Sequence, residues 1–287
     1  MQSAGWLLAP AVFPWVALVV GLCAGSFLNV VIHRLPKMME REWRAECAEL
    51  AGETPPRAEP YNQIVPRSRC PACGKGITAL QNIPVLSFAF LKGRCYHCEA
   101  RISVKYPLVE ILAGIGAAYS AWRFGFSLTA LGAAVFVWFT IALAFIDQET
   151  GLLPDDLTLL LVWLGLLFNV GGAFVPLADA VVGAAAGYLS LWLVYWAYKL
   201  ATGKEGMGYG DFKLNAAVGA FLGWKMLPVV ILLSSLVGLI FGALQMLAAK
   251  RRWDAGFRFH FGPYLAIAGI VALYWGGQIV RWYLGTP

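Results

Sequence analysis

Two aspartates stand at positions where an acid could do chemistry. Asp147 closes the apolar run 139–147, and Asp211 lies in the polar loop Gly208-Tyr-Gly-Asp211-Phe-Lys213. A carboxylate at the edge of an apolar segment is costly to bury and indicates a functional role. Two such carboxylates within hydrogen-bonding reach of each other would share one proton. The ionised one could then activate a water that attacks a peptide carbonyl, and the neutral one could protonate the leaving amine.

Helix capping is the alternative explanation for acids of this kind. Aspartate often opens a helix only to accept backbone N–H bonds. We expect capping or solvation at Asp155 and Asp156, which follow Pro154, and for Asp211 capping stays an open alternative. It does not explain Asp147, because a negative charge near the C-terminus of a helix opposes the helix dipole.

Three glycines, Gly206, Gly208 and Gly210, stand at alternate positions before Asp211. Glycine permits positive φ and lets another backbone approach closely. We therefore expect a peptide substrate to run against Gly208 and Gly210. An ordinary flexible loop between helices is the alternative.

Four cysteines form two C-x-x-C pairs, Cys70 with Cys73 and Cys95 with Cys98, separated by 21 residues. This spacing is close to the two knuckles of a zinc ribbon. Four thiolates around one ion make a closed structural zinc site rather than a catalytic one. Two disulfides are the alternative, which a reducing cytosolic placement disfavours. We expect His97, inside the second knuckle, to be a bystander.

The composition identifies a membrane protein. Hydrophobic residues make up 60% of the 287 residues, charged residues only 13%, and the mean hydropathy is +0.67. A soluble domain is roughly 45–50% apolar. Crossing a bilayer takes about 17–25 apolar residues, and the sequence predicts an all-α fold with about eight such spans. These lie near 11–32, 106–122, 127–146, 157–175, 177–198, 212–227, 228–248 and 262–284.

Lysine and arginine counts predict the orientation of these spans, because cytoplasmic loops carry the excess of both. Alternating the segments between spans puts 19 of these residues on one side and 3 on the other. The predicted topology therefore has both termini outside and the long loop, with both aspartates, at the cytoplasmic face. No basic residue precedes the first apolar run, which we read as a permanent anchor rather than a cleaved signal.

The order of these segments divides the chain into three parts. They are a first transmembrane anchor over 1–32, a cytoplasmic loop domain with the zinc site over 33–105, and a seven-helix membrane domain over 106–287. Within the loop domain, residues 37–50 have the composition of a short helix, and 52–60 resemble a linker. The net charge of +6 suits anionic membrane lipid as a partner, and we expect no nucleic acid.

Taken together, these motifs resemble those of the type IV prepilin leader peptidase family over nearly the full length. The resemblance rests on segments 25–36, 69–73, 82–87, 93–98, 102–110, 146–155 and 205–213. It implies that Asp147 and Asp211 are the catalytic aspartates of a bacterial inner-membrane GxGD-type peptidase. It also implies that the basic leaders of type IV prepilins and type II secretion pseudopilins are cleaved. S-adenosylmethionine-dependent methylation of the new N-terminus, associated with the cytoplasmic loop, would follow.

The loop 147–156 carries several acids and no lysine or arginine. We hypothesise that Glu149 and Asp156 attract the basic leader, because complementary charge steers encounter. Helix capping and hydration of these two acids form an alternative that we weight equally.

Two other functions remain open at this stage. A general intramembrane protease would cut transmembrane helices, but the cysteine loop argues against it. A transporter or assembly scaffold would relay protons through acids at mid-bilayer, and only Glu110 approaches such a position.

Overall fold

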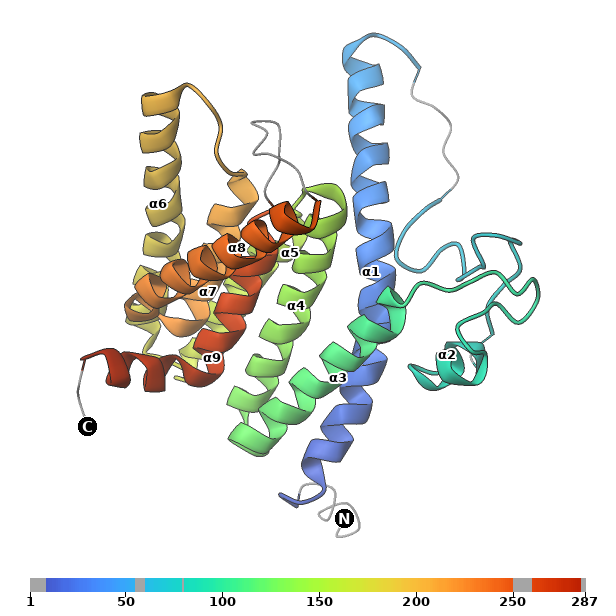
Figure 1. Ribbon diagram of the computed structural model, residues 1–287, viewed down its shortest axis with the longest axis horizontal. Helices are drawn as coiled ribbons and strands as arrows, with labels where there is room; N and C mark the ends of the chain where they lie inside the picture. The colour runs from blue at the N-terminus through green and yellow to red at the C-terminus, as the bar shows by residue number, and fades with distance from the viewer. Residues whose placement is uncertain (1–8, 55–59, 79, 250–259, 285–287) are drawn as a thin grey trace. The chain divides into compact units, whose positions relative to one another are not determined.

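The computed structural model describes residues 9–54, 60–78, 80–249 and 260–284. The predicted all-helical fold is confirmed (Figure 1), and within the described residues only two isolated β-bridges occur. The α-helices are α1 (Phe13–Leu50), α2 (Leu86–Phe90), α3 (Lys105–Phe124), α4 (Leu128–Thr150), α5 (Asp155–Val170), α6 (Leu177–Thr202), α7 (Tyr209–Leu222), α8 (Leu227–Ala249) and α9 (Gly262–Leu284). Two short 3₁₀ helices are η2 (Leu80–Asn82) and η3 (Trp224–Met226).

The chain forms two compact units, residues 1–130 and 131–287. The N-terminal unit therefore takes in the first apolar helix, the cysteine loop and α3. The predicted division of the chain into three parts, with boundaries at residues 32 and 105, stays a prediction. Arg57 and the basic residues between 250 and 258 lie outside the described residues.

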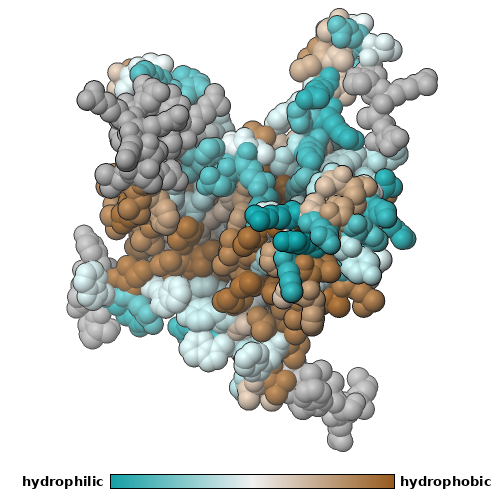
Figure 2. Space-filling model, turned by 45° about the vertical axis from the view of Figure 1, so that its right-hand side comes forward, coloured by the Kyte–Doolittle hydropathy of each residue, from teal (hydrophilic) through white to brown (hydrophobic). Residues whose placement is uncertain are grey.

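Eight of the helices follow the eight predicted spans in order. Five of them, α1, α4, α6, α8 with the preceding η3, and α9, are long and apolar enough to cross a membrane by length and composition. Helices α5 and α7 have only 16 and 14 residues, and α3 does not reach the same apolar character. Figure 2 shows hydrophobic side chains over much of the face drawn, as expected of a surface that meets lipid.

The first helix differs from the expectation. Instead of a span ending near residue 32 and a separate helix over 37–50, α1 runs without interruption for 38 residues and contains Pro36. The physical reason is that residues 37–50 are rich in strong helix formers, so the helix continues after its apolar part ends. Its last turns are consequently exposed and charged.

Small residues bring α1 and α3 together inside the N-terminal unit. A Cβ on Gly25 would lie 2.6 Å from the Cα of Glu110, so the two backbones touch at this point. The buried Glu110 carboxylate accepts the N–H of Val85 at 2.8 Å. Asn29 donates its side-chain N–H to the Tyr106 carbonyl at 3.0 Å. Glu110 therefore ties the cysteine loop to α3, a contact that the sequence did not indicate.

Helix α7 lies at the centre of the C-terminal unit. It packs against α5, α6 and α9, and every side chain from Leu214 to Leu222 is buried. Two asparagines connect it to its neighbours. Asn215 donates to the Gly187 carbonyl of α6 at 2.8 Å, and Asn169 of α5 donates to the Ala220 carbonyl at 2.8 Å. Because this short helix is buried on all sides, its sequence is apolar enough to have been predicted as a membrane span.

Glycines let α6 and α7 meet backbone to backbone. A Cβ on Gly219 would overlap the carbonyl of Gly183, and one on Gly187 would lie 2.5 Å from the Asn215 carbonyl oxygen. No side chain stands between the helices at these points, so neither helix can move away without losing dispersion contacts along its length.

This contact predicts that Gly219→Ala destabilises the protein. The added methyl meets backbone atoms, which cannot rotate away, and overpacking of this kind costs about 1–3 kcal/mol. Thermal unfolding of the purified protein, followed by tryptophan fluorescence, measures the effect. Gly277→Ala is the matched control, because a Cβ there meets nothing within 4 Å. Equal melting temperatures for the two variants would contradict the prediction.

Candidate active site and four-cysteine cluster

Asp147 lies in the last turn of α4 and is buried, with 5% of its surface exposed. Its Oδ2 accepts the backbone N–H of Gly262, the first residue of α9, at 3.1 Å. The N-terminus of a second helix thus offsets the unfavourable position of this carboxylate at the end of α4. This bond joins residues 115 positions apart.

Asp211 lies in the first turn of α7 and is equally buried, with 6% exposed. Its Oδ2 accepts the N–H of Gly208, the residue that precedes the helix, at 3.2 Å. Its Oδ1 is buried and has no hydrogen-bond partner. Capping therefore accounts for one oxygen of this carboxylate and leaves the other available.

The fold brings the two aspartates into one neighbourhood. The two carboxylates lie near enough that a negative charge on Asp147 would repel one on Asp211. The side chain of Leu153 lies between the two segments: its Cβ is 2.5 Å from where a Cβ on Gly210 would be, and its Cδ1 is 3.3 Å from that position on Gly262. The site is therefore built from the ends of α4, α7 and α9, together with the loop that leads into α5.

The glycines before Asp211 act through close approach and not through positive φ. None of Gly206, Gly208 and Gly210 has a positive φ. Gly210 lacks room for a side chain because of Leu153, and a Cβ on Gly206 would lie 2.9 Å from the ring of Tyr198. Gly208 is exposed and extended, with φ −84°. The conformational part of the sequence argument was wrong, because packing alone selects glycine at Gly206 and Gly210.

Asp155 and Asp156 do not cap α5, contrary to one of the two roles expected for them. Pro154 is the N-cap residue, and no side chain caps this helix. Asp155 instead accepts a hydrogen bond from Lys213 of α7 at 2.5 Å, an ion pair that joins α5 to α7 two residues after Asp211. Asp156 is exposed, as solvation predicts, and so is Glu149 in the last turn of α4.

Sequence reasoning missed Gly262, Leu153 and His260 at this site. His260 is half-buried, and its Nε2 lies 3.4 Å from where a Cβ on Gly151 would be, a residue whose N–H donates to the Asp147 carbonyl at 2.8 Å. The one available signal was Gly262-Pro263 at the head of the last apolar run, since proline favours the first turn of a helix. Nothing local connects that pair to Asp147.

The four sulfurs of Cys70, Cys73, Cys95 and Cys98 lie within 4.8 Å of one another, and all four cysteines are free thiols. The Sγ atoms of Cys70 and Cys98 are 3.8 Å apart. Sulfurs around a tetrahedral zinc ion, each about 2.3 Å from the metal, would be about 3.8 Å apart. The cluster therefore has the geometry to hold a metal ion.

The two knuckles have the same local structure. In each, the residue four positions after the first cysteine donates its N–H to that cysteine's carbonyl, Gly74 to Cys70 at 2.9 Å and Glu99 to Cys95 at 3.0 Å. Both donors have positive φ, +70° and +56°, a conformation that glycine adopts without strain at Gly74. The backbone N–H groups of Cys73 and Ala72 lower the pKa of the Cys70 thiol to about 6. The thiolate is the form that binds metal.

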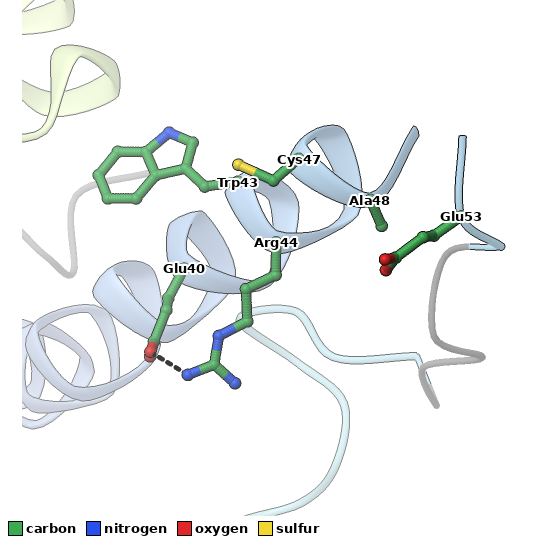
Figure 3. A pocket seen from close by; sticks show the side chains of 6 residues that line it. All are labelled: Glu40, Trp43, Arg44, Cys47, Ala48 and Glu53. Carbon is green, nitrogen blue, oxygen red and sulfur yellow. Dashed lines mark hydrogen bonds and ion pairs between the residues drawn. The ribbon is translucent and has the colours of Figure 1, made fainter. Parts of the chain in front are cut away.

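A depression on the surface of the N-terminal unit contains neither the two aspartates nor the four cysteines of the cluster (Figure 3). It is lined by Glu40, Trp43, Arg44, Cys47, Ala48 and Glu53. Its principal polar contact is the exposed ion pair of Glu40 and Arg44, one turn apart on α1. Such a pair stabilises a helix slightly.

A helical membrane protein with a buried pair of aspartates and a four-cysteine loop has the features of a membrane aspartic peptidase. Comparison with known families agrees. Residues 19–124 match the bacterial peptidase A24 N-terminal domain, and residues 134–243 match the type IV leader peptidase family. These matches fall one in each compact unit, with the cysteines in the first and the aspartates in the second.

Curated relatives extend the match to nearly the whole chain. The prepilin leader peptidase/N-methyltransferase of Aeromonas salmonicida is 55% identical over 98% of this chain and 95% of its own. The proteins of that name from Pseudomonas aeruginosa and Neisseria gonorrhoeae are 51% and 47% identical, over 96% and 98% of this chain and 94% and 98% of their own. No solved structure matches. The chain belongs to the type IV leader peptidase family and is a bifunctional prepilin peptidase and N-methyltransferase of a bacterial membrane.

Proposed function

We propose that Asp147 and Asp211 are the catalytic pair that cleaves the leader from prepilins and pseudopilins. One observation carries this assignment: each carboxylate is buried and accepts a glycine N–H at Oδ2. The second oxygen of Asp211 has no partner at all. A buried polar atom without a partner is costly, and a reacting water or peptide would supply one.

The chemistry follows from two carboxylates that hold one proton between them. The ionised carboxylate takes a proton from a water molecule, whose oxygen attacks the carbonyl carbon of the scissile peptide. The neutral carboxylic acid donates a hydrogen bond to the carbonyl oxygen. When the C–N bond breaks, the leaving nitrogen receives a proton from the pair, which is thereby ready for another cycle.

The exposed Gly208 and the small Gly210 support a substrate that runs as an extended peptide along the loop before α7. A leader peptide that meets the enzyme here would present its scissile bond beside Asp211. We infer that this occurs at the cytoplasmic face of the inner membrane, with both termini outside. The excess of lysine and arginine in the corresponding loops supports this orientation, as does the suitability of those residues for anionic lipid.

Zinc is the metal that the cysteine cluster fits. Four thiolates with tetrahedral spacing and no open position suit a structural zinc ion, and such an ion stabilises a loop with few buried apolar groups. The ring of His97 packs edge-on against Tyr96, and His97 is not among the four ligands. The methyl donor for the second activity, which we propose to be S-adenosylmethionine, would act with this loop domain.

We expect Asp147→Asn and Asp211→Asn each to abolish cleavage. An amide can neither take a proton from water nor return one to the leaving amine, and loss of a general acid or base costs about 10²–10⁴ in rate. Incubation of each purified variant with a prepilin, followed by mass spectrometry of the product, measures this. Methylation of a pilin peptide that already has its mature N-terminus is the control for folding. Cleavage that survives in both variants would refute the assignment.

Cys70→Ser is expected to release the zinc ion, because the remaining three thiolates no longer close the site. Methylation should then be lost while cleavage of a prepilin continues, since the aspartates belong to the other compact unit. Metal analysis of the purified variant and both assays test this. Cys23→Ser is the matched control, as this exposed thiol lies outside the cluster. A full complement of zinc in Cys70→Ser would count against the proposed site.

We also propose that Glu149 and Asp156, both exposed, attract the basic leader. The double variant Glu149→Lys, Asp156→Lys should raise KM for cleavage at low salt, with kcat little changed, and the difference should shrink as salt screens the charges. A substrate whose leader has its basic residues replaced by serine is the control and should lose this sensitivity. An unchanged KM for the basic leader at low salt would remove the hypothesis.

A further inference from the structure

The N-terminus of α9 presents one free backbone donor to the aspartates. The first N–H groups of a helix have no partner within the helix. Here Tyr264 and Leu265 donate theirs to the Phe261 carbonyl at 3.1 Å, and Pro263 has none to donate. The N–H of Gly262 remains, and it donates to Oδ2 of Asp147.

Only glycine fits at this position. Gly262 is buried, and a Cβ there would lie 2.7 Å from Oδ2 of Asp147 and 3.1 Å from its Cγ. The φ of Gly262 is not positive, so the requirement comes from contact with the carboxylate and not from backbone conformation. Any side chain would displace either Asp147 or the start of α9.

The arrangement repeats at the second aspartate. Gly208 donates to Oδ2 of Asp211 as Gly262 does to Oδ2 of Asp147. Leu153 lies against Gly210 on one side and Gly262 on the other. The segment before α7 and the start of α9 are therefore both packed on one side chain, and each holds one carboxylate.

We propose that Gly262 is a positioning residue of the peptidase, which fixes Asp147 through its N–H and through the absence of a side chain. Gly262 lies outside residues 134–243, which match the peptidase family, so α9 becomes part of the catalytic unit. The inference rests on the proposed role of Asp147 as a catalytic residue.

Gly262→Ala is the first test, with Gly277→Ala as its control in the same helix, where a Cβ meets nothing within 4 Å. Both are made in the full chain. We expect Gly262→Ala to lower kcat for prepilin cleavage by about 100-fold, the scale of a misplacement of about 1 Å. KM should change little, because we place the leader along the loop before α7. Methylation of a peptide with a mature pilin N-terminus should also be retained.

A second variant removes the hydrogen bond without adding an atom that could collide. Ligation of a synthetic C-terminal segment that begins upstream of Phe261, and that already contains glycolic acid in place of Gly262, replaces the Gly262 amide by an ester. Loss of a hydrogen bond to a charged group corresponds to a factor of about ten or more in a rate constant. We therefore expect kcat to fall by that factor, while the melting temperature stays close to that of the ligated native chain.

Wild-type kcat in the ester protein would show that the bond does not position Asp147. Loss of both activities in Gly262→Ala together with wild-type kcat in the ester protein would reduce Gly262 to a packing residue, which also overturns the proposal. Failure of the catalytic assignment itself has a different signature, since Asp147→Asn would then still cleave. The two failures are therefore distinguishable.

Discussion

The C-terminal unit depends on the burial of α7 on all sides. A 14-residue helix is too short to gain stability from its own backbone bonds, so its neighbours must supply it. They approach closely because glycines at Gly183, Gly187 and Gly219 remove side chains from the contact between α6 and α7. Asparagines then satisfy carbonyls that no water reaches. The consequence is a central helix that carries a buried carboxylate in its first turn.

The position of that carboxylate creates a second problem, because burial of an acid is costly unless its oxygens are bonded. The hydrogen bonds in the structure meet this requirement only in part. Glycine N–H groups bind one oxygen of Asp211 and one of Asp147, and the other oxygen of Asp211 is buried without a partner. A buried acid with a purely structural role would have both oxygens bonded. Incomplete satisfaction fits a site whose last partners are water and a peptide.

Local patterns in the sequence predicted much of this arrangement. Apolar length predicted the helices, and the C-x-x-C spacing predicted the cluster, because the two cysteines of each pair are only three positions apart. The bond from Gly262 to Asp147 could not be predicted, because it joins residues 115 positions apart and depends on how α9 packs. The same holds for Leu153, which occupies the space that makes Gly210 necessary. The uninterrupted α1 was not predicted for a different reason: the apolar run ends near residue 32, but the helix formers of 37–50 continue the helix through Pro36.

The two halves of the chain hold their functional groups by different physical means. In the C-terminal unit the aspartates are fixed by helices that pack along their whole length, so their positions are consequences of the fold. The cysteine loop has no helix longer than five residues between α1 and α3 among the residues described. It is organised by short turns and by a carboxylate, Glu110, that holds the N–H of Val85. The four-cysteine cluster of this loop could hold a metal ion, and metal binding stabilises segments that lack a packed core. If methylation depends on this loop, as we propose, cleavage and methylation can be lost separately, which a single shared site would not permit.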